Sequence, residues 1–213
     1  MNSDFIQEKK MLRLGKFLIL LLIPFITNCK MKNIQDNNED YEVYADEIVR
    51  NFAKEMKKEY GLLCIGSGGS MPHDVANIGV MFTIQKKMTS LEEARELEIA
   101  AIQKLLDHIN NHQKIRPYLR EYPFKYDRVR ISISFTNENN EQYTDGSITY
   151  MYQARNKIFY KKAESCIAEG YQITDPDTNE VYTVPDREDY KLIDYYDEPY
   201  EEALKKVKSL PKN

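Results

Sequence analysis

Apolar and polar positions along the chain after residue 40 follow first a helical and then a strand period. Tyr41–Tyr60 places apolar residues at three- and four-residue steps, which predicts an amphipathic helix that ends at Gly61. A second helix is predicted from Leu91, because Ser90 is a good N-cap and Glu93 would complete a capping box. The apolar stripe of this second helix is formed by Ala94, Leu97, Ala101, Ile102, Leu105, Leu106 and Ile109.

Alternating segments separate and follow these helices. We expect strands at LLCIG (62–66), at Val75–Gln85 and at Val129–Phe135, with SGGSMPHD as the turn between the first two. Further strands are expected at Ile148–Tyr152, where Ile148, Tyr150 and Tyr152 would share a face, and at KIFYKK (157–162). YQIT and VYTVP would form a hairpin around DPDTNE, and YKLIDYY a late strand. Asp197 and Pro199 would open a short helix that runs through Ser209.

This order of elements predicts an α+β fold. The simplest arrangement is a mostly antiparallel sheet with two main helices packed on one face and a short C-terminal helix. Residues 41–213 are long enough for one domain with its own core. A polar linker, residues 29–40, precedes this single domain.

The N-terminal segment KFLILLLIPFITNCK, from Lys16 to Lys30, is typical of an export signal. Its apolar run, Phe17–Ile26, has half of the about 20 residues that a membrane-spanning helix needs. A positively charged flank lies upstream: Lys9, Lys10, Arg13 and Lys16. We therefore predict that residues 1–28 are a signal peptide, with the true start at Met11. The alternative is an uncleaved helix that tethers the domain.

Ile26-Thr27-Asn28-Cys29 resembles the lipobox of bacterial lipoprotein signal peptides, although Asn28 departs from the usual small residue. The resemblance implies lipidation of Cys29 and cleavage before it. Two or three acyl chains hold a protein stably on a membrane. The expected location is the cell envelope, and Lys30 after Cys29 is compatible, by family analogy, with the outer membrane.

Charge and cysteine content limit the partners. The chain of 213 residues carries −4, and residues 1–28 contribute four basic and two acidic groups, so the remainder carries −6. An acidic domain without a basic stripe is a poor nucleic-acid binder, so no nucleic-acid partner is expected. In an oxidising compartment Cys64 and Cys166 would either form a disulfide or leave Cys64 as a buried core residue.

The segment CIGSGGSMPHD, Cys64 to Asp74, offers two chemical hypotheses. The glycines of Gly66–Ser70 suggest a ligand-binding loop, but no lysine follows them and a strand rather than a helix comes next. Cys64 with His73 and Asp74 suggests a cysteine-dependent hydrolase or thiol enzyme. Nothing in the spacing requires that geometry, and we expect a flexible connection between strands instead.

Two further groups of residues suggest binding. His108 and His112 are four residues apart and would share a helix face, as zinc ligands do, yet a third ligand is not evident; the competing interpretation is a pair of exposed residues at the helix C-terminus. The tyrosine-rich segments suggest either a protein-binding surface or half-buried strand aromatics, and the second is favoured. Their tyrosines are Tyr143, Tyr150, Tyr152, Tyr160, Tyr190, Tyr195, Tyr196 and Tyr200.

GLLCIGSGGSM, IRPYLREYPF and EPYEEALKKV resemble segments of a family of small, membrane-anchored lipoproteins from obligate intracellular bacteria. That family has no assigned activity, so the resemblance implies one domain and no catalytic residues. We therefore expect a lipid-anchored envelope protein with a non-catalytic interaction or structural role. It would need no cofactor or metal, and its partners would be the membrane and a protein.

Overall fold

The computed structural model describes residues 38–210, with side chains from residue 41 onward. The predicted signal peptide and Cys29 lie outside these residues. Three helices are described, α2 (Asn38–Tyr60), α3 (Leu91–Asn111) and α4 (Tyr200–Ser209). The strands are β1 (Leu63–Ser70), β2 (Asn77–Gln85), β3 (Val129–Thr136), β4 (Ile148–Ala154), β5 (Lys157–Ala168), β6 (Tyr171–Thr174), β7 (Val181–Val184) and β8 (Arg187–Pro199). Helix α2 therefore takes in the last three residues of the predicted linker.

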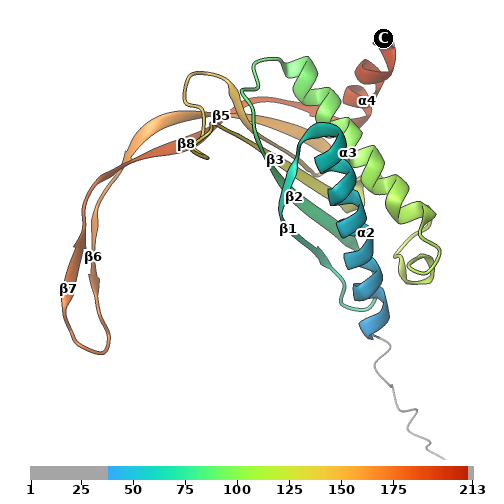
Figure 1. Ribbon diagram of the computed structural model, residues 1–213, viewed down its shortest axis with the longest axis horizontal. Coiled ribbons are helices and arrows are strands. Elements are labelled where there is room, and N and C mark those ends of the chain that lie inside the picture. Colours follow the sequence, from blue (N-terminus) through green and yellow to red (C-terminus); the bar gives the residue numbers. More distant parts are fainter. Residues whose placement is uncertain (1–37, 211–213) are drawn as a thin grey trace, which may run out of the picture. The chain divides into compact units, whose positions relative to one another are not determined.

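Six strands form one mixed sheet in the order β1-β2-β3-β4-β5-β8. All neighbours are antiparallel except β2 and β3, which are parallel and are joined by α3. A parallel pair needs such a crossover, and the crossing helix must lie on one face of the sheet. Figure 1 shows the helices on one side of the strands. The α+β class and the mostly antiparallel sheet are confirmed.

The core lies between the helices and one face of the sheet. β3 buries alternate residues, Val129, Ile131, Ile133 and Phe135, as its pattern predicted. The predicted stripe of α2 is buried as well, and Phe52 packs edge-on against Phe82 of β2 with ring centroids 5.6 Å apart. Ser90 caps α3 and accepts a hydrogen bond from the Glu93 backbone N–H, but the Glu93 carboxylate pairs with Lys86 instead of closing the box.

The extent of one predicted strand and the buried face of another are wrong. β1 runs on to Ser70, so the glycines of the predicted turn lie within an edge strand, and the turn is confined to the residues after Ser70. In β4 a register shift between Ile148 and Tyr150 reverses the alternation. Ile148 is buried, but the residues buried after it are Thr149, Met151 and Gln153, while Tyr150 and Tyr152 turn to the opposite face. A bulge of one residue has this effect because the side-chain period of a strand is two.

The C-terminal helix also starts later than predicted. Asp197 and Pro199 belong to β8, and Pro199 rather than Asp197 occupies the N-cap position of α4. Asp197 instead pairs with Lys157 of β5, with 2.6 Å between Nζ and Oδ2. The ladder between β5 and β8 therefore holds this aspartate in the sheet.

A buried polar cluster joins α3, β5, β8 and α4. Glu198 is almost fully buried and receives three donors: Arg95 Nε at 2.6 Å, Lys206 Nζ at 2.6 Å and the Tyr160 hydroxyl at 3.1 Å. Burial of such a carboxylate is tolerable because its charge is paired and its oxygens are hydrogen-bonded. One turn from Arg95, Glu98 is also fully buried, and neither of its carboxylate oxygens has a hydrogen-bond partner among the described residues.

Glu98 should make the fold less stable as pH rises. Burial raises the pKa of its carboxyl well above the usual 4.5, so the folded protein keeps a proton that the unfolded chain releases. The free energy of unfolding is therefore at its full value at pH values below the pKa of Glu98 in the unfolded chain. As pH rises from there toward the pKa in the folded protein, it falls by up to about 1.4 kcal/mol per pH unit. We predict that Glu98→Gln removes this decline and exceeds the wild type in free energy of unfolding at pH 8.

Denaturant titrations at pH 4.5 and pH 8 measure the difference. Glu96→Gln, an exposed neighbour on the same helix, is the matched control and should leave the pH dependence unchanged. If Glu98→Gln and the wild type lose stability in parallel between the two pH values, Glu98 is not the titrating group.

Candidate functional site

Cys64 and His73 do not meet. In the β1–β2 hairpin Cys64 pairs with Phe82, whereas Ser70 pairs with Asn77 at the other end of the strand. Cys64 and Ser70 are six positions apart along the strand, about 20 Å, and His73 lies in the turn beyond Ser70. Cys64 is exposed rather than buried, and its thiol lies 3.6 Å from the Gly66 carbonyl oxygen. A nucleophile and base arrangement would need the two side chains within hydrogen-bonding distance.

The Cys64–Cys166 disulfide is not formed. Both residues are free and exposed, Cys64 on β1 and Cys166 on β5. Three strands, β2, β3 and β4, lie between β1 and β5 in the sheet. Because neighbouring strands are about 4.8 Å apart, the separation is far beyond the 7 Å that a disulfide can bridge.

The glycines of Gly66–Ser70 are strand residues. Gly68 pairs with Gly79 of β2, and Gly69 with Ile78. A Cβ at Gly69 would lie 2.4 Å from the Asn77 carbonyl oxygen, so glycine there permits close approach of the two backbones. Because this segment is an extended strand and not a loop at a helix N-terminus, its backbone amides do not converge on one point as those of a phosphate-binding loop do.

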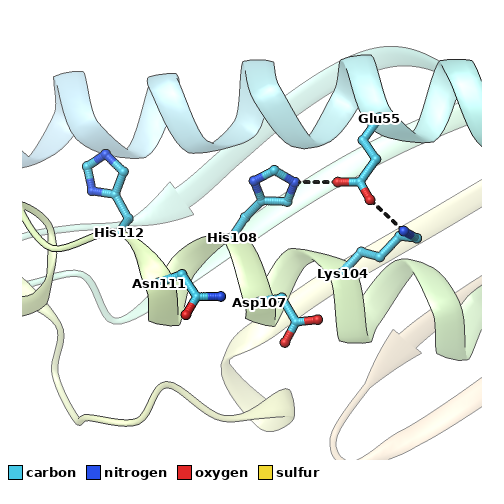
Figure 2. Close-up of a pocket in the computed structure, with 6 residues that line it drawn as sticks. All are labelled: Glu55, Lys104, Asp107, His108, Asn111 and His112. Atoms are coloured by element: carbon cyan, nitrogen blue, oxygen red, sulfur yellow. Dashed lines mark hydrogen bonds and ion pairs between the residues drawn. The ribbon is translucent and has the colours of Figure 1, made fainter.

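His108 and His112 contact α2 rather than each other (Figure 2). His108 Nε2 lies 2.6 Å from a Glu55 carboxylate oxygen, and the other oxygen of Glu55 lies 2.5 Å from Lys104 Nζ. His112 lies 3.8 Å from Glu47, and its Nδ1 accepts a hydrogen bond from the Ile115 backbone N–H. Among the described residues no group of three histidine, cysteine or acidic side chains is placed to hold a metal ion. These residues are therefore half-buried pairs that join two helices.

An extended two-stranded ribbon is the most unusual feature of the described chain. β4 pairs with β5 only from Lys157 to Lys162, whereas β8 pairs with β5 as far as Ala168. Beyond this point the chain continues into the hairpin β6–β7, as Figure 1 shows. We call residues 164–192 the arm. An isolated two-stranded ribbon is at best marginally stable in water, because it buries little apolar surface.

One face of the end of the arm is entirely apolar. In the β6–β7 hairpin Tyr171 pairs with Val184 and Ile173 pairs with Tyr182, so these four side chains share a face. The opposite face carries Gln172, Thr174, Thr183 and one apolar residue, Val181. Tyr171, Ile173 and Tyr182 are 59%, 46% and 51% exposed. We call Tyr171–Val184 the tip hairpin. This apolar face is not covered by the body of the fold, which makes it a candidate interaction surface.

The arm is also strongly acidic. It holds eight acidic residues and two basic ones, a net charge of −6, while the whole chain carries −4. The acidic residues are Glu164, Glu169, Asp175, Asp177, Glu180, Asp186, Glu188 and Asp189. Such a charge keeps the apolar face in solution and disfavours contact with acidic surfaces. It also favours a partner surface that carries a positive charge.

The sheet face opposite the helices carries a shallow apolar groove of about 450 Å³. We call it the open groove. Gly68 of β1, Gly79 of β2 and Arg130 of β3 follow one another in register across it. Met81, Ser132 and Tyr152 form the next row. The groove exists because glycines supply no side chains, while Met81, 49% exposed, and the tyrosines rise beside them.

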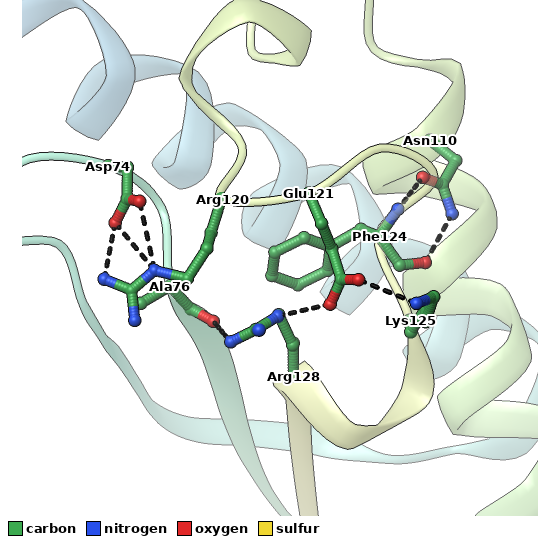
Figure 3. Close-up of polar contacts among 8 residues, drawn as sticks. All are labelled: Asp74, Ala76, Asn110, Arg120, Glu121, Phe124, Lys125 and Arg128. Atoms are coloured by element: carbon green, nitrogen blue, oxygen red, sulfur yellow. Dashed lines mark hydrogen bonds and ion pairs between the residues drawn. The ribbon is translucent and has the colours of Figure 1, made fainter.

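Arg130 is the one cation that lines the open groove. The connection between α3 and β3 supplies other basic side chains, but these have partners (Figure 3). Arg120 forms a two-pronged pair with Asp74, Arg128 and Lys125 both pair with Glu121, and Arg116 stacks on Tyr122. No described residue forms an ion pair with Arg130.

Sequence reasoning missed both the arm and the groove. The predicted tip hairpin is confirmed, and so is a strand at YKLIDYY, but nothing in their patterns indicated that they extend beyond the rest of the sheet. A signal was present, because acidic residues crowd 164–192 while few charges interrupt β2 and β3. Of the tyrosine-rich segments, Tyr160 and Tyr200 are buried, whereas Tyr190, Tyr195 and Tyr196 are exposed.

Comparison with known proteins gives no relative: no family model, no curated protein and no solved structure matches the chain. Within residues 38–210, none of the helices combines the length and apolar character needed to cross a membrane. The candidate site therefore rests on the geometry of the structure. It consists of two surfaces, the arm with its tip hairpin and the open groove.

We predict that the Glu55 pairs stabilise the helix layer above about pH 4.5. Hydrogen bonds from Lys104 and His108 lower the pKa of Glu55 below 4.5, so their stabilisation is present at neutral pH and is lost as pH falls through the folded pKa. Glu55→Gln should lower the free energy of unfolding by about 1 kcal/mol at pH 7. The deficit should shrink as pH falls through the folded pKa, so it should be smaller at pH 3 than at pH 7.

Chemical denaturation at the two pH values measures this change. Glu42→Gln, an exposed position on the same helix, is the control and should have no effect. A deficit for Glu55→Gln that is as large at pH 3 as at pH 7 would show that the carboxylate charge is not what joins the helices.

Proposed function

We propose that this chain is a lipid-anchored envelope protein with a non-catalytic interaction role, and that the arm is its protein-binding element. The observation that carries the proposal is the uncovered apolar face of the tip hairpin. Three of its four side chains are about half exposed, and β6 and β7 pair with no strand of the six-stranded sheet. Exposing such a face is costly unless a partner covers it for part of the time.

The edges of the arm support the same role. β8 is the last strand of the sheet, and β5 loses its β4 neighbour after Lys162. Unpaired strand edges can accept a further strand, so proteins normally shield them with charge. The acidic residues along the arm supply this shielding against indiscriminate pairing, while leaving the apolar face of the tip available to a complementary surface.

The two rival functions have less support. A thiol enzyme needs Cys64 and His73 in contact, and the β1–β2 register separates them. A ligand-binding module at Gly66–Ser70 needs a loop whose amides converge on the ligand, and these residues are an extended strand paired with β2. A nucleic-acid partner is disfavoured by the −6 charge of the arm.

The arm should contact a protein through one face only. We predict that a photo-crosslinking amino acid in place of Tyr182, on the apolar face, captures a protein in intact cells. The same group at Thr183, on the opposite face of the tip hairpin, is the matched control and should capture far less. Gel electrophoresis and mass spectrometry identify the product. Equal capture from both positions, or none from either, would contradict the proposal.

The anchor is tested separately. Cys29→Ala should abolish labelling by a fatty-acid analogue and leave a longer, uncleaved chain, because the thiol is the acceptor of the diacylglyceryl group. Cys64→Ser is the control and should keep the label. A wild-type protein that retains its N-terminus and takes up no label would refute the lipid anchor and favour an uncleaved tether.

A further inference from the structure

The arm and the open groove are complementary surfaces of one chain. The tip hairpin offers four apolar side chains and an acidic surround, and the groove offers an apolar floor with one cation. We propose that the tip hairpin of one copy docks, apolar face down, into the open groove of a second copy of this chain. This inference rests on the proposed function, because it names the partner of the arm.

The dimensions of the two surfaces agree. β6 and β7 pair over four residues, which gives a hairpin about 13 Å long. The groove is lined by residues of β1, β2, β3 and β4, so it crosses three strand spacings, about 14 Å. A hairpin laid across the strands would therefore fill the groove from one end to the other.

The floor of the groove admits another backbone closely. A Cβ placed at Gly68 would meet nothing within 4 Å. One at Gly79 would meet the Arg130 Cβ at 3.5 Å and the carbonyl oxygens of Arg130 and Gly68 at 3.6 Å, which are ordinary van der Waals contacts. The space above Gly68 is therefore free, and that above Gly79 is not overfilled. Ile173 and Tyr182, which pair across the tip hairpin, would occupy it and bury their exposed surface against Met81 and Tyr152.

Charge fixes the orientation of the docked hairpin. Arg130 stands at the groove without an ion-pair partner among the described residues, while Asp175, Asp177 and Glu180 surround the turn of the tip hairpin. An arginine and a carboxylate that meet at the rim of an interface contribute more to association rate and specificity than to affinity. The net −6 of the arm also disfavours a second arm, or an acidic membrane surface, as the occupant.

A reciprocal exchange accounts for both uncovered surfaces. If each copy inserts its tip hairpin into the groove of the other, a two-fold dimer forms, and the contact closes without exposing another groove. One hairpin on one groove would leave a free hairpin and a free groove, and so would build open-ended chains. The two-fold arrangement also doubles the area buried per dimer.

Crosslinking between two full-length copies tests the docking. In a background where the exposed Cys64 and Cys166 are replaced by serine, one tagged copy carries Ile173→Cys and a differently tagged copy carries Met81→Cys. A disulfide needs Cα atoms within about 7 Å, so mild oxidation of co-expressing cells should link the two tags. Gln172→Cys, on the opposite face of the hairpin, is the matched control, and we expect at least about tenfold less linked product from it.

Filling the groove supplies a second measurement. Gly68→Val should remove most of the linked product, because the new side chain occupies the groove while valine suits a strand and meets no neighbour at its Cβ. Arg130→Glu should lower the yield, and Glu180→Lys in the other copy should restore part of it. Circular dichroism of each variant checks that the fold is retained.

Four results would overturn the inference. A single chain with both cysteines that closes an internal disulfide at high dilution would show that the arm covers its own groove. Equal linking from positions 172 and 173 would show an unspecific encounter. No linking from position 173, together with photo-capture of a different protein from position 182, would reject the second copy and leave the proposed function standing; loss of both signals rejects both.

Discussion

β5 and β8 are longer than β4, and this difference in length determines which apolar side chains of the chain are exposed to solvent. β4 has seven residues, while β5 and β8 have twelve and thirteen and pair with each other along most of that length. Beyond Lys162, the last residue of β5 that pairs with β4, the sheet narrows to the two strands β5 and β8. This ribbon has two free edges and no described helix packed on it. Apolar side chains of the kind that form the core in the body of the sheet are therefore exposed on this ribbon.

A second asymmetry comes from the parallel pairing of β2 with β3. The crossover through α3 brings the helices to one face of the sheet, and the buried stripes of α2 and α3 meet the apolar faces of the strands there. The other face receives no helix. Its residues are small or half exposed, namely Gly68, Gly79, Met81, Ser132 and Tyr152, and this composition leaves a groove rather than a second core.

Periodicity predicted the body of the fold well because burial there follows the local repeat. The stripe of α2 and the alternation of β3 are confirmed residue by residue. The face of β4 was wrong because a bulge between Ile148 and Tyr150 changes the alternation, and no residue pattern announces it. Asp197 was predicted to cap a helix because its local sequence suits a cap. In the structure it lies in β8 instead, where it pairs with β5.

The candidate sites were harder to predict than the fold, because they are surfaces that no other layer of the protein covers. A strand pattern states which residues are apolar, but it does not state whether another layer covers them, so the arm was indistinguishable from core strands. The opposite error affected Cys64, whose apolar neighbours suggested burial although it is exposed at the edge of the sheet. His108 was expected to be exposed, but it contacts the carboxylate of Glu55. The prediction missed this contact because Glu55 lies on the other helix, and the sequence does not state which residues of two helices meet.

The central claim is that the arm is stabilised by a partner and not by its own body. Hydrogen–deuterium exchange of the backbone amides tests this most directly, on the full chain in native membranes and on the same chain diluted in detergent. We predict that β6 and β7 exchange within seconds on dilution but are protected in the membrane, while β2 and β3 stay protected in both. Protection of β6 and β7 as strong as that of β3 in the diluted protein would contradict the account.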